Sequence, residues 1–235
     1  MNDRRNFLRK TGLAVCGAAG ALIGRASAAE KPGDKETHTA SKVPPTEKLM
    51  YQHGLVQRVV MTYEEVAKRL EQKEQLPPTA LNSGPLVDEF IEQYHEELEE
   101  KYVFPVFLEA EQQKELIKTL RTQHRTGRRL SQRIYYLAGK ENISEDPTRT
   151  DLARALRRYA RMYRAHAAYE DTILLPALRD VATSAQIGKM GKQFVETTQK
   201  DFAEGGLASV LGRLQPIEKS LEINQLSVFT ASVGT

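Results

Sequence analysis

A histidine pattern occurs twice in this chain of 235 residues and constrains its fold more than any other feature. Each copy has one histidine, a second histidine 42 residues later, and a glutamate four residues after that. A shift of 71 residues relates the copies, and it also carries Gln52 onto Gln123 and Pro105 onto Pro176. The members are His53, His95 and Glu99 in the first copy and His124, His166 and Glu170 in the second. The spacing therefore belongs to a duplicated segment.

A histidine and a glutamate four residues apart can bind one ion only from a helix, where they project from the same face on consecutive turns. On a strand they would lie about 13 Å apart, at about 3.3 Å per residue. Imidazole and carboxylate are ligands that iron and manganese favour. Burying six such groups without partners would cost several kcal/mol per group. The pattern predicts a two-metal site in a helical core, with all six residues as ligands.

Apolar residues and the pattern histidines recur at alternating steps of three and four, which predicts amphipathic helices. The expected ranges are about 47–75, 83 to about 105, 110–138 and 150–180, with the second helix ending or kinking near Pro105. We expect the first helix to bury Leu49, His53, Val56, Val60, Tyr63, Ala67 and Leu70, and the fourth to bury Leu152, Leu156, Tyr159, Tyr163, His166, Glu170 and Ile173. The acids Glu96, Glu97 and Glu100 are expected on a solvent-exposed face.

Short connections between these helices indicate an all-α, up-down-up-down four-helix bundle over residues 46–180. Residues 29–45 are polar and rich in proline, as in a flexible linker, so His38 is not expected to be a ligand. Residues 181–235 should add one helix, from Ser184 to Ala203, followed by a weakly patterned tail with Gly205, Gly206 and Pro216.

Residues 1–28 resemble a twin-arginine export signal. Arg4 and Arg5 are followed by an apolar stretch over residues 11–24 and a small-residue cleavage sequence at 26–28. The apolar stretch is shorter than the roughly 20 residues that a span needs. We therefore expect an exported, periplasmic protein with no stable membrane span after cleavage. A lipid anchor on Cys16 is not expected, because that cysteine lies inside the apolar stretch.

Cleavage after residue 28 would remove five of the 34 basic residues and one of the 31 acidic ones. The remaining net charge, about −1, gives no reason to expect a nucleic-acid partner. The basic run from Arg154 to Arg164 is expected to be a solvated helix face. Cleavage also removes the single cysteine, which leaves only nitrogen and oxygen donors for a metal.

The order of ligands resembles the hemerythrin-like, or HHE cation-binding, family: a lone histidine on helices one and three, and His-x-x-x-Glu on helices two and four. The likeness extends to the stretches Tyr94–Glu99 and Glu170–Pro176. Ferritin-like proteins are disfavoured, because they use Glu-x-x-His. The resemblance implies two non-haem iron ions, oxo- or hydroxo-bridged, with manganese as an alternative. It also implies bridging roles for Glu99 and Glu170 and terminal roles for His53, His95, His124 and His166.

The chain departs from the oxygen-carrying hemerythrins at two positions. Arg128 stands where they have a second helix-three histidine, and the expected helix-four carboxylate is Glu170, four residues after His166, where theirs is an aspartate five residues after the histidine. With four histidines and two bridging glutamates, about two coordination positions stay open, which suits a small ligand such as O2, nitric oxide or peroxide. Tyr163 or its repeat counterpart Glu92 would be the candidates to close one of them.

Three functions remain open from the sequence: a protein that binds iron and a small ligand, an enzyme that consumes peroxide or oxidises iron, and a bundle whose metal is structural. Zinc is disfavoured because it prefers four tetrahedral ligands. No protein partner is indicated.

Overall fold

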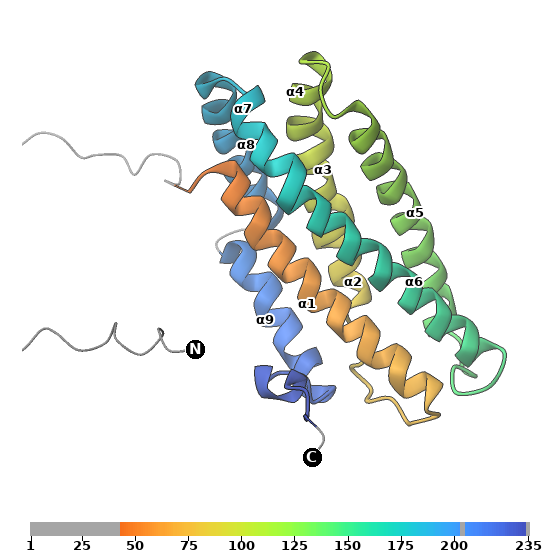
Figure 1. Cartoon of the computed structure of the whole chain (residues 1–235). Coiled ribbons are helices and arrows are strands. Elements are labelled where there is room, and N and C mark those ends of the chain that lie inside the picture. Colours follow the sequence, from red (N-terminus) through yellow and green to blue (C-terminus); the bar gives the residue numbers. More distant parts are fainter. Residues whose placement is uncertain (1–42, 203–204, 234–235) are drawn as a thin grey trace, which may run out of the picture. The chain divides into compact units, whose positions relative to one another are not determined.

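The computed structural model describes residues 43–202 and 205–233 (Figure 1). The predicted signal, most of the predicted linker and His38 lie outside these residues. The described part is helical and contains no strand, which confirms the all-α prediction. Four segments form the up-down-up-down bundle. The first segment is α1 (Pro45–Glu71) and the third is α5 (Lys114–Ala138). The second segment is continuous and consists of α2 (Gly84–Leu86), η1 (Val87–His95), α3 (Glu96–Leu98), η2 (Glu99–Val103) and α4 (Phe104–Glu109). The fourth segment consists of α6 (Thr148–Tyr169), η3 (Glu170–Leu174) and α7 (Leu175–Val181).

The core lies between α1 and α6, which run side by side (Figure 1), and the two segments that pack against them. Helix α1 begins at Pro45, whose missing N–H costs nothing in a first helical turn. The predicted stripe of α1 is confirmed, because every residue in it is at most 2% exposed. Burial of a full aliphatic side chain contributes about 1.5–3 kcal/mol, so this stripe is a main source of the bundle's stability.

Wider, π-helical turns begin at both repeat glutamates, at η2 and at η3. Two residues after each turn comes a proline, Pro105 or Pro176. Proline has no N–H, and its ring crowds the carbonyl four residues earlier, so a wider turn lets the helix continue past it. Of the two outcomes predicted near Pro105, an end or a kink, the helix does not end there: its geometry changes from π-helical to α-helical at Phe104, and the segment runs on to Glu109.

The η3 turn also changes which residues face the core. Ile173, predicted to be buried, is 39% exposed, whereas Leu174 is fully buried. A π-helical turn holds more residues than an α-helical one, so it advances the buried face by one position. Spacing counted on an ideal helix fails at this point.

The C-terminal region contains the predicted helix, α8 (Ser184–Phe202), and a further helix that the sequence did not predict, α9 (Gly206–Ser220), followed by a 3-10 turn, η5 (Leu226–Phe229). Helix α9 packs on α1 through Val210, Leu214 and Ile217, at helical spacing, although it contains Pro216. None of the described helices combines the length and the apolarity that crossing a bilayer requires.

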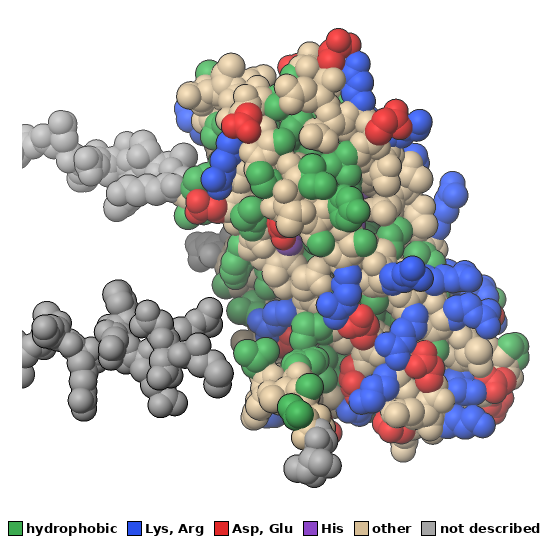
Figure 2. Space-filling model, viewed as in Figure 1, with side chains coloured by type: hydrophobic (Ala, Val, Ile, Leu, Met, Phe, Trp, Pro, Cys, Tyr) green, Lys and Arg blue, Asp and Glu red, His purple; other side chains and the backbone are tan. Residues whose placement is uncertain are grey.

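Lys and Arg side chains gather over the lower part of α6 and α1 in the space-filling view (Figure 2). The predicted basic run of α6 is exposed, and two of its members are neutralised by α1. Arg157 lies 2.8 Å from Glu71, and Arg164 pairs with Glu64. This face is therefore a solvated, partly ion-paired surface, as predicted.

Candidate metal centre

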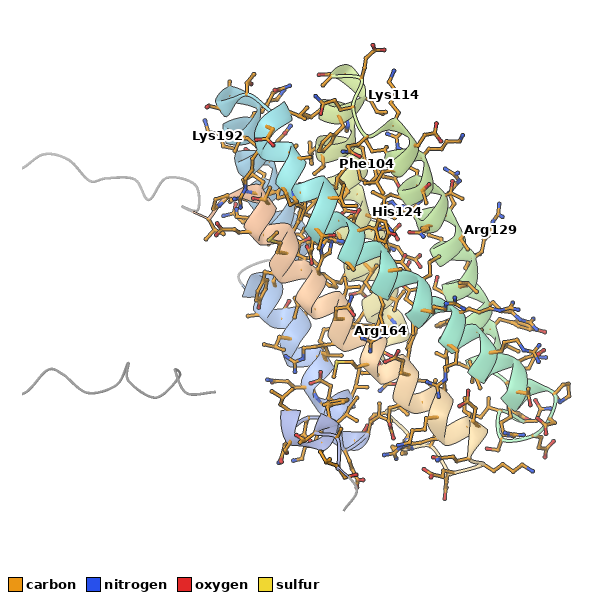
Figure 3. The ribbon with its side chains drawn as sticks, in the orientation of Figure 1. Phe104, Lys114, His124, Arg129, Arg164 and Lys192 are labelled. Carbon is orange, nitrogen blue, oxygen red and sulfur yellow. The ribbon has the colours of Figure 1, made fainter. Side chains whose placement is uncertain are left out.

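The six predicted ligands converge in the middle of the bundle, and each is at most 2% exposed. Each bundle segment contributes one histidine, and the two π-helical turns contribute the glutamates at their first positions. Figure 3 shows the arrangement on α5, where His124 lies within the bundle while Arg129 points away from it. Helical periodicity accounts for the inward position of His124, because each ligand occupies a core position of its helix.

The ligands form two groups of four that share both glutamates. In the first group, Nε2 of His53 lies 3.2 Å from Glu170 Oε2, and Nε2 of His95 lies 3.4 Å from Glu99 Oε1. The second group contains His124 and His166. Their Nε2 atoms lie 3.4 Å from Glu99 Oε2 and 3.1 Å from Glu170 Oε2, respectively. Each group thus contains two imidazoles and two carboxylates, enough donors for one ion.

Two of the histidines are oriented by carboxylates from the other repeat. Nδ1 of His53 lies 2.6 Å from Asp171 Oδ1, and Nδ1 of His124 lies 2.8 Å from Glu100 Oε1. Such carboxylate partners fix the ring of a metal-binding histidine and raise its basicity. Neither acid was predicted to contact a histidine, although the shift of 71 residues that relates the histidines also carries Glu100 onto Asp171.

The other two histidines are oriented by glutamines from their own repeat. Nδ1 of His95 lies 2.9 Å from Gln52 Oε1, and Nδ1 of His166 lies 2.9 Å from Gln123 Oε1. Gln52 is itself held in place, because its Nε2 donates to the hydroxyl of Tyr94 at 3.3 Å. The pairing of the glutamines was visible as part of the repeat, but their role required the structure.

These partners determine what the imidazoles present to the centre. A carboxylate or amide oxygen only accepts, so each Nδ1 carries a hydrogen and, in the neutral ring, each Nε2 offers a lone pair inward. The Nε2 atoms of His124 and His166 lie 3.2 Å apart. None of the four carboxylate oxygens of Glu99 and Glu170 has a hydrogen-bond partner among the described residues.

Facing electron-pair donors repel one another unless a cation lies between them. Two ligands bonded to one ion at about 2.1 Å and at right angles would lie about 3 Å apart. Measured spacings of 3.1 to 3.4 Å match this geometry. The residues present therefore fit a pair of cations.

The charges of the cluster lead to the same conclusion. Burial disfavours the charged form of Glu99, but attraction to His95, His124 and His53 holds its pKa well below the usual value. Burial also opposes protonation of His124, yet its contacts with Glu100 and Glu99 raise its pKa to about 10. Burial acts on His53 in the same way, yet its contacts with Asp171, Glu170 and Glu99 hold its pKa well above the usual value. Without a metal, protons on His53 and His124 therefore offset the carboxylates, and metal binding should release them.

Next to the second ligand group lies a buried polar cluster of Glu96, Tyr163 and Arg128. Glu96 is fully buried, so the prediction that it faces solvent is wrong. The hydroxyl of Tyr163 donates to Glu96 Oε1, and Arg128 Nη2 lies 2.7 Å from Oε2 of the same carboxylate. Tyr163 of α6 and Arg128 of α5 both lie against this carboxylate, so these helices cover the face beside the ligands and Arg128 neutralises the acid.

The other two acids of that helix differ. Glu97 is exposed, as predicted, and pairs with Lys101. Glu100 is one-third exposed and reaches His124. Of the two candidates for an additional ligand, Tyr163 binds Glu96 and Glu92 accepts a hydrogen bond from Ser131. Among the described residues, Glu92 belongs to no group of histidines and acids that could hold a metal ion.

Comparison with protein families agrees with the geometry. The chain matches the Hemerythrin HHE cation binding domain over residues 45–178 and again over 116–196. The chain belongs to this family. The second match begins 71 residues after the first, which is the shift of the internal repeat. The HHE domain binds cations, and the two groups that share Glu99 and Glu170 could hold them; Glu96, Glu100 and His124 form a third, smaller group in the described part of the chain.

Three curated relatives are similar over nearly the whole length of this HHE protein. They are the uncharacterized proteins Mb2018 of Mycobacterium bovis and MT2051 and Rv1995 of two Mycobacterium tuberculosis strains. Each is 38% identical over 222 residues, which cover 92% of this chain and 87% of the relative. So large a share necessarily extends beyond residue 196, so the likeness includes part of α8 and α9. No solved structure gives a significant match.

Proposed function

We propose that this HHE protein holds two non-haem iron ions and binds a small ligand, namely O2, nitric oxide or peroxide. The observation that carries the proposal is the pair of ligand groups sharing Glu99 and Glu170, whose four carboxylate oxygens have no hydrogen-bond partner among the described residues. Nitrogen and oxygen donors in this proportion suit iron, with manganese as the alternative metal. Zinc would not need a shared pair of carboxylates.

In this proposal His53 and His95 hold one ion, His124 and His166 hold the other, and the glutamates bridge them. Iron held by these residues would supply a binding position for a small ligand and electron transfer to it. The surrounding residues keep the ligands in place: Asp171 and Glu100 hold hydrogens on the Nδ1 atoms of the histidines that they contact. The buried core around the site excludes bulk water.

An enzyme that consumes peroxide or oxidises iron is the second candidate. It is favoured by the hydrogen bonds that engage Tyr163 and Glu92 elsewhere, because these leave about two coordination positions without a protein ligand. A carrier needs one open position, whereas turnover of a ligand across both ions uses two. A binding protein would keep the ligand unchanged and an enzyme would convert it, and solution measurements of the ligand concentration distinguish the two.

We further propose that the protein is exported by the twin-arginine route, on the basis of the N-terminal sequence alone. This route carries folded proteins, so the metal centre can be loaded before transport. Replacing Arg4 and Arg5 with lysine should retain the protein inside the cell. Fractionation of cells that express the wild-type protein and this variant tests the proposal.

The metal centre is tested by metal analysis of the purified protein. We expect two irons per chain, and loss of at least half of the metal in Glu99→Ala and in Glu170→Ala, because each carboxylate serves both groups. Glu97→Ala is the matched control, since it removes an exposed glutamate from the same segment and should retain all metal. Equal metal content in all variants would sink the assignment.

The ligand is tested on the iron-loaded protein. Hydrogen peroxide and nitric oxide are added separately, while the near-ultraviolet spectrum and the ligand concentration are followed. A stable nitrosyl spectrum without peroxide loss would support a binding protein. Catalytic loss of peroxide, absent in Glu99→Ala, would establish the enzyme instead.

A further inference from the structure

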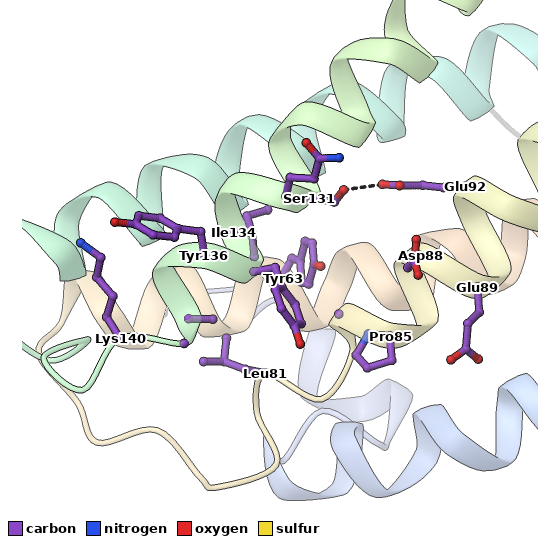
Figure 4. A pocket seen from close by; sticks show the side chains of 15 residues that line it. Tyr63, Leu81, Pro85, Asp88, Glu89, Glu92, Ser131, Ile134, Tyr136 and Lys140 are labelled. Atoms are coloured by element: carbon purple, nitrogen blue, oxygen red, sulfur yellow. Dashed lines mark hydrogen bonds between the residues drawn. The ribbon is translucent and has the colours of Figure 1, made fainter.

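A cavity of about 730 Å³ lies apart from the metal centre, between the C-terminal half of α5 and the α2–η1 segment (Figure 4). None of the six residues of the two ligand groups lines it. Its walls combine apolar and aromatic side chains with acids near one end. The residues that matter here are Tyr63, Asp88, Glu89, Glu92, Ser131 and Lys140. A volume of this size is typical of sites for small organic molecules, about 300–1,000 Å³.

Tyr63 contributes a buried polar group to this cavity. Its side chain is only 2% exposed, and its hydroxyl makes no hydrogen bond within the described parts of the chain. The ring is held edge-on against Tyr159, with 5.2 Å between the ring centres. The hydroxyl oxygen is therefore available to a polar group inside the cavity that Tyr63 lines.

The acids give the cavity its charge. Glu89 is neutralised by Arg213, whose Nη1 lies 2.5 Å from its carboxylate. Asp88 and Glu92 take part in no ion pair among the described residues, and the hydrogen bond from Ser131 engages one oxygen of Glu92. They stand four residues apart in η1 and both line the cavity, so a single cationic group can contact both.

Lys140 does not neutralise these acids. Its ammonium group lies over the ring of Tyr136, 4.8 Å from the ring centre, and Figure 4 shows both at the end of the cavity away from Glu92. The cavity thus has an acidic end and an apolar, aromatic remainder.

We propose that this cavity binds a small organic cation with an apolar ring, of the arylalkylammonium type. The ammonium group would lie between Asp88 and Glu92, and the ring would pack against Leu81, Pro85 and Ile134. A polar substituent would give the Tyr63 hydroxyl its partner. This site is additional to the metal centre and does not depend on its function.

Titration calorimetry with the iron-loaded, full-length protein tests the charge preference with three probes that share one phenol ring. Tyramine is a cation, p-cresol is neutral and 4-hydroxyphenylacetate is an anion. Tyramine should bind at least about tenfold more tightly than p-cresol, because a charge-assisted hydrogen bond is worth about 1.5–3 kcal/mol, and the anion should not bind. Equal binding of the three, or no binding at all, would overturn the proposal.

Variants locate the site. Asp88→Asn should weaken tyramine binding about tenfold and leave p-cresol binding unchanged, and Glu92→Gln should weaken tyramine binding less, because the pKa of Glu92 is about 7. Glu115→Gln, in the first turn of α5 and outside the cavity lining, is the control and should bind like the wild type. An unchanged tyramine affinity in both cavity variants would contradict the proposal. Their iron content should equal that of the wild type, so a failure here is distinct from a failure of the metal centre.

Discussion

The two repeats build equivalent halves of the metal centre but support them differently. In the first half, the chain of contacts from His95 through Gln52 continues to Tyr94, whose hydroxyl lies 2.6 Å from Thr198 of α8. Ala165 occupies the repeat position of Tyr94 and is exposed, so no such chain leaves the second half. Among the described residues, this chain of contacts to the C-terminal region supports the first half only.

The second half has its own support, the buried cluster of Glu96, Tyr163 and Arg128. The repeat counterparts of Glu96 and Arg128 are Ala167 and Gln57, so the cluster has no equivalent in the first half. The comparison shows that duplication preserved the ligands and their immediate partners, while the next layer diverged. Two ions bound here would therefore differ in their surroundings although their ligands match.

The largest expected effect comes from removing the cation of this cluster. Arg128→Met would leave the carboxylate of Glu96 buried without its charged partner. Breaking a fully buried pair costs about 3–5 kcal/mol, and because Arg128 is 36% exposed we expect about 2–3 kcal/mol. Urea unfolding of the metal-free protein measures this. The first-half counterpart Gln57→Met should change stability by less than about 0.5 kcal/mol. Similar losses in both variants would refute the asymmetry.

A smaller effect is expected from filling the space next to Tyr163. A Cβ added at Gly127 would lie 2.3 Å from the Tyr163 hydroxyl, whereas one at Gly54 would meet nothing within 4 Å. Gly127→Ala should cost about 1–2 kcal/mol after its gain in helix propensity, and Gly54→Ala should stabilise by about 0.5–1 kcal/mol. Thermal unfolding distinguishes the two signs, and a gain in both would mean that Tyr163 can move aside.

The carboxylates of Asp171 and Glu100, which contact Nδ1 of His53 and His124, test whether the two halves bind their ions independently. Asp171→Asn and Glu100→Gln should each weaken metal binding about 10–100-fold, because each removes the charged partner of one histidine. Titration with a chelator should show one ion lost early in each variant while the other is retained. Loss of both ions together would indicate that the shared glutamates couple the halves tightly.

The smallest effect concerns Glu92, the first-half counterpart of Tyr163. Burial is the main reason that its pKa rises from 4.5 to about 7, with Glu96 and Asp88 adding to the shift and Ser131 and Arg128 opposing it. The folded protein therefore holds this proton more tightly than the unfolded chain, so stability falls as pH rises from about 4.5 to 7. Glu92→Gln should flatten that part of the stability profile measured by urea unfolding. An unchanged slope would mean that a group other than Glu92 causes the pH dependence in this range.

The sequence by itself determined the four helical segments of the bundle, the helix α8, the buried face of α1 and the six histidines and glutamates that converge in the core. This worked because helical geometry relates residues three and four apart by local bonds alone, and because the repeat shows which spacings belong together. The same reasoning failed at Ile173, where a π-helical turn changes the local geometry.

Only the tertiary structure decided which partner each ligand has. His53 meets Asp171 across 118 residues, and Glu96 is buried because two other helices cover it. Helix α9 likewise depends on its contact with α1, since its glycines and proline disfavour a helix locally. Contacts between distant segments depend on how whole helices pack, and a pattern counted along one helix carries no information about its neighbours.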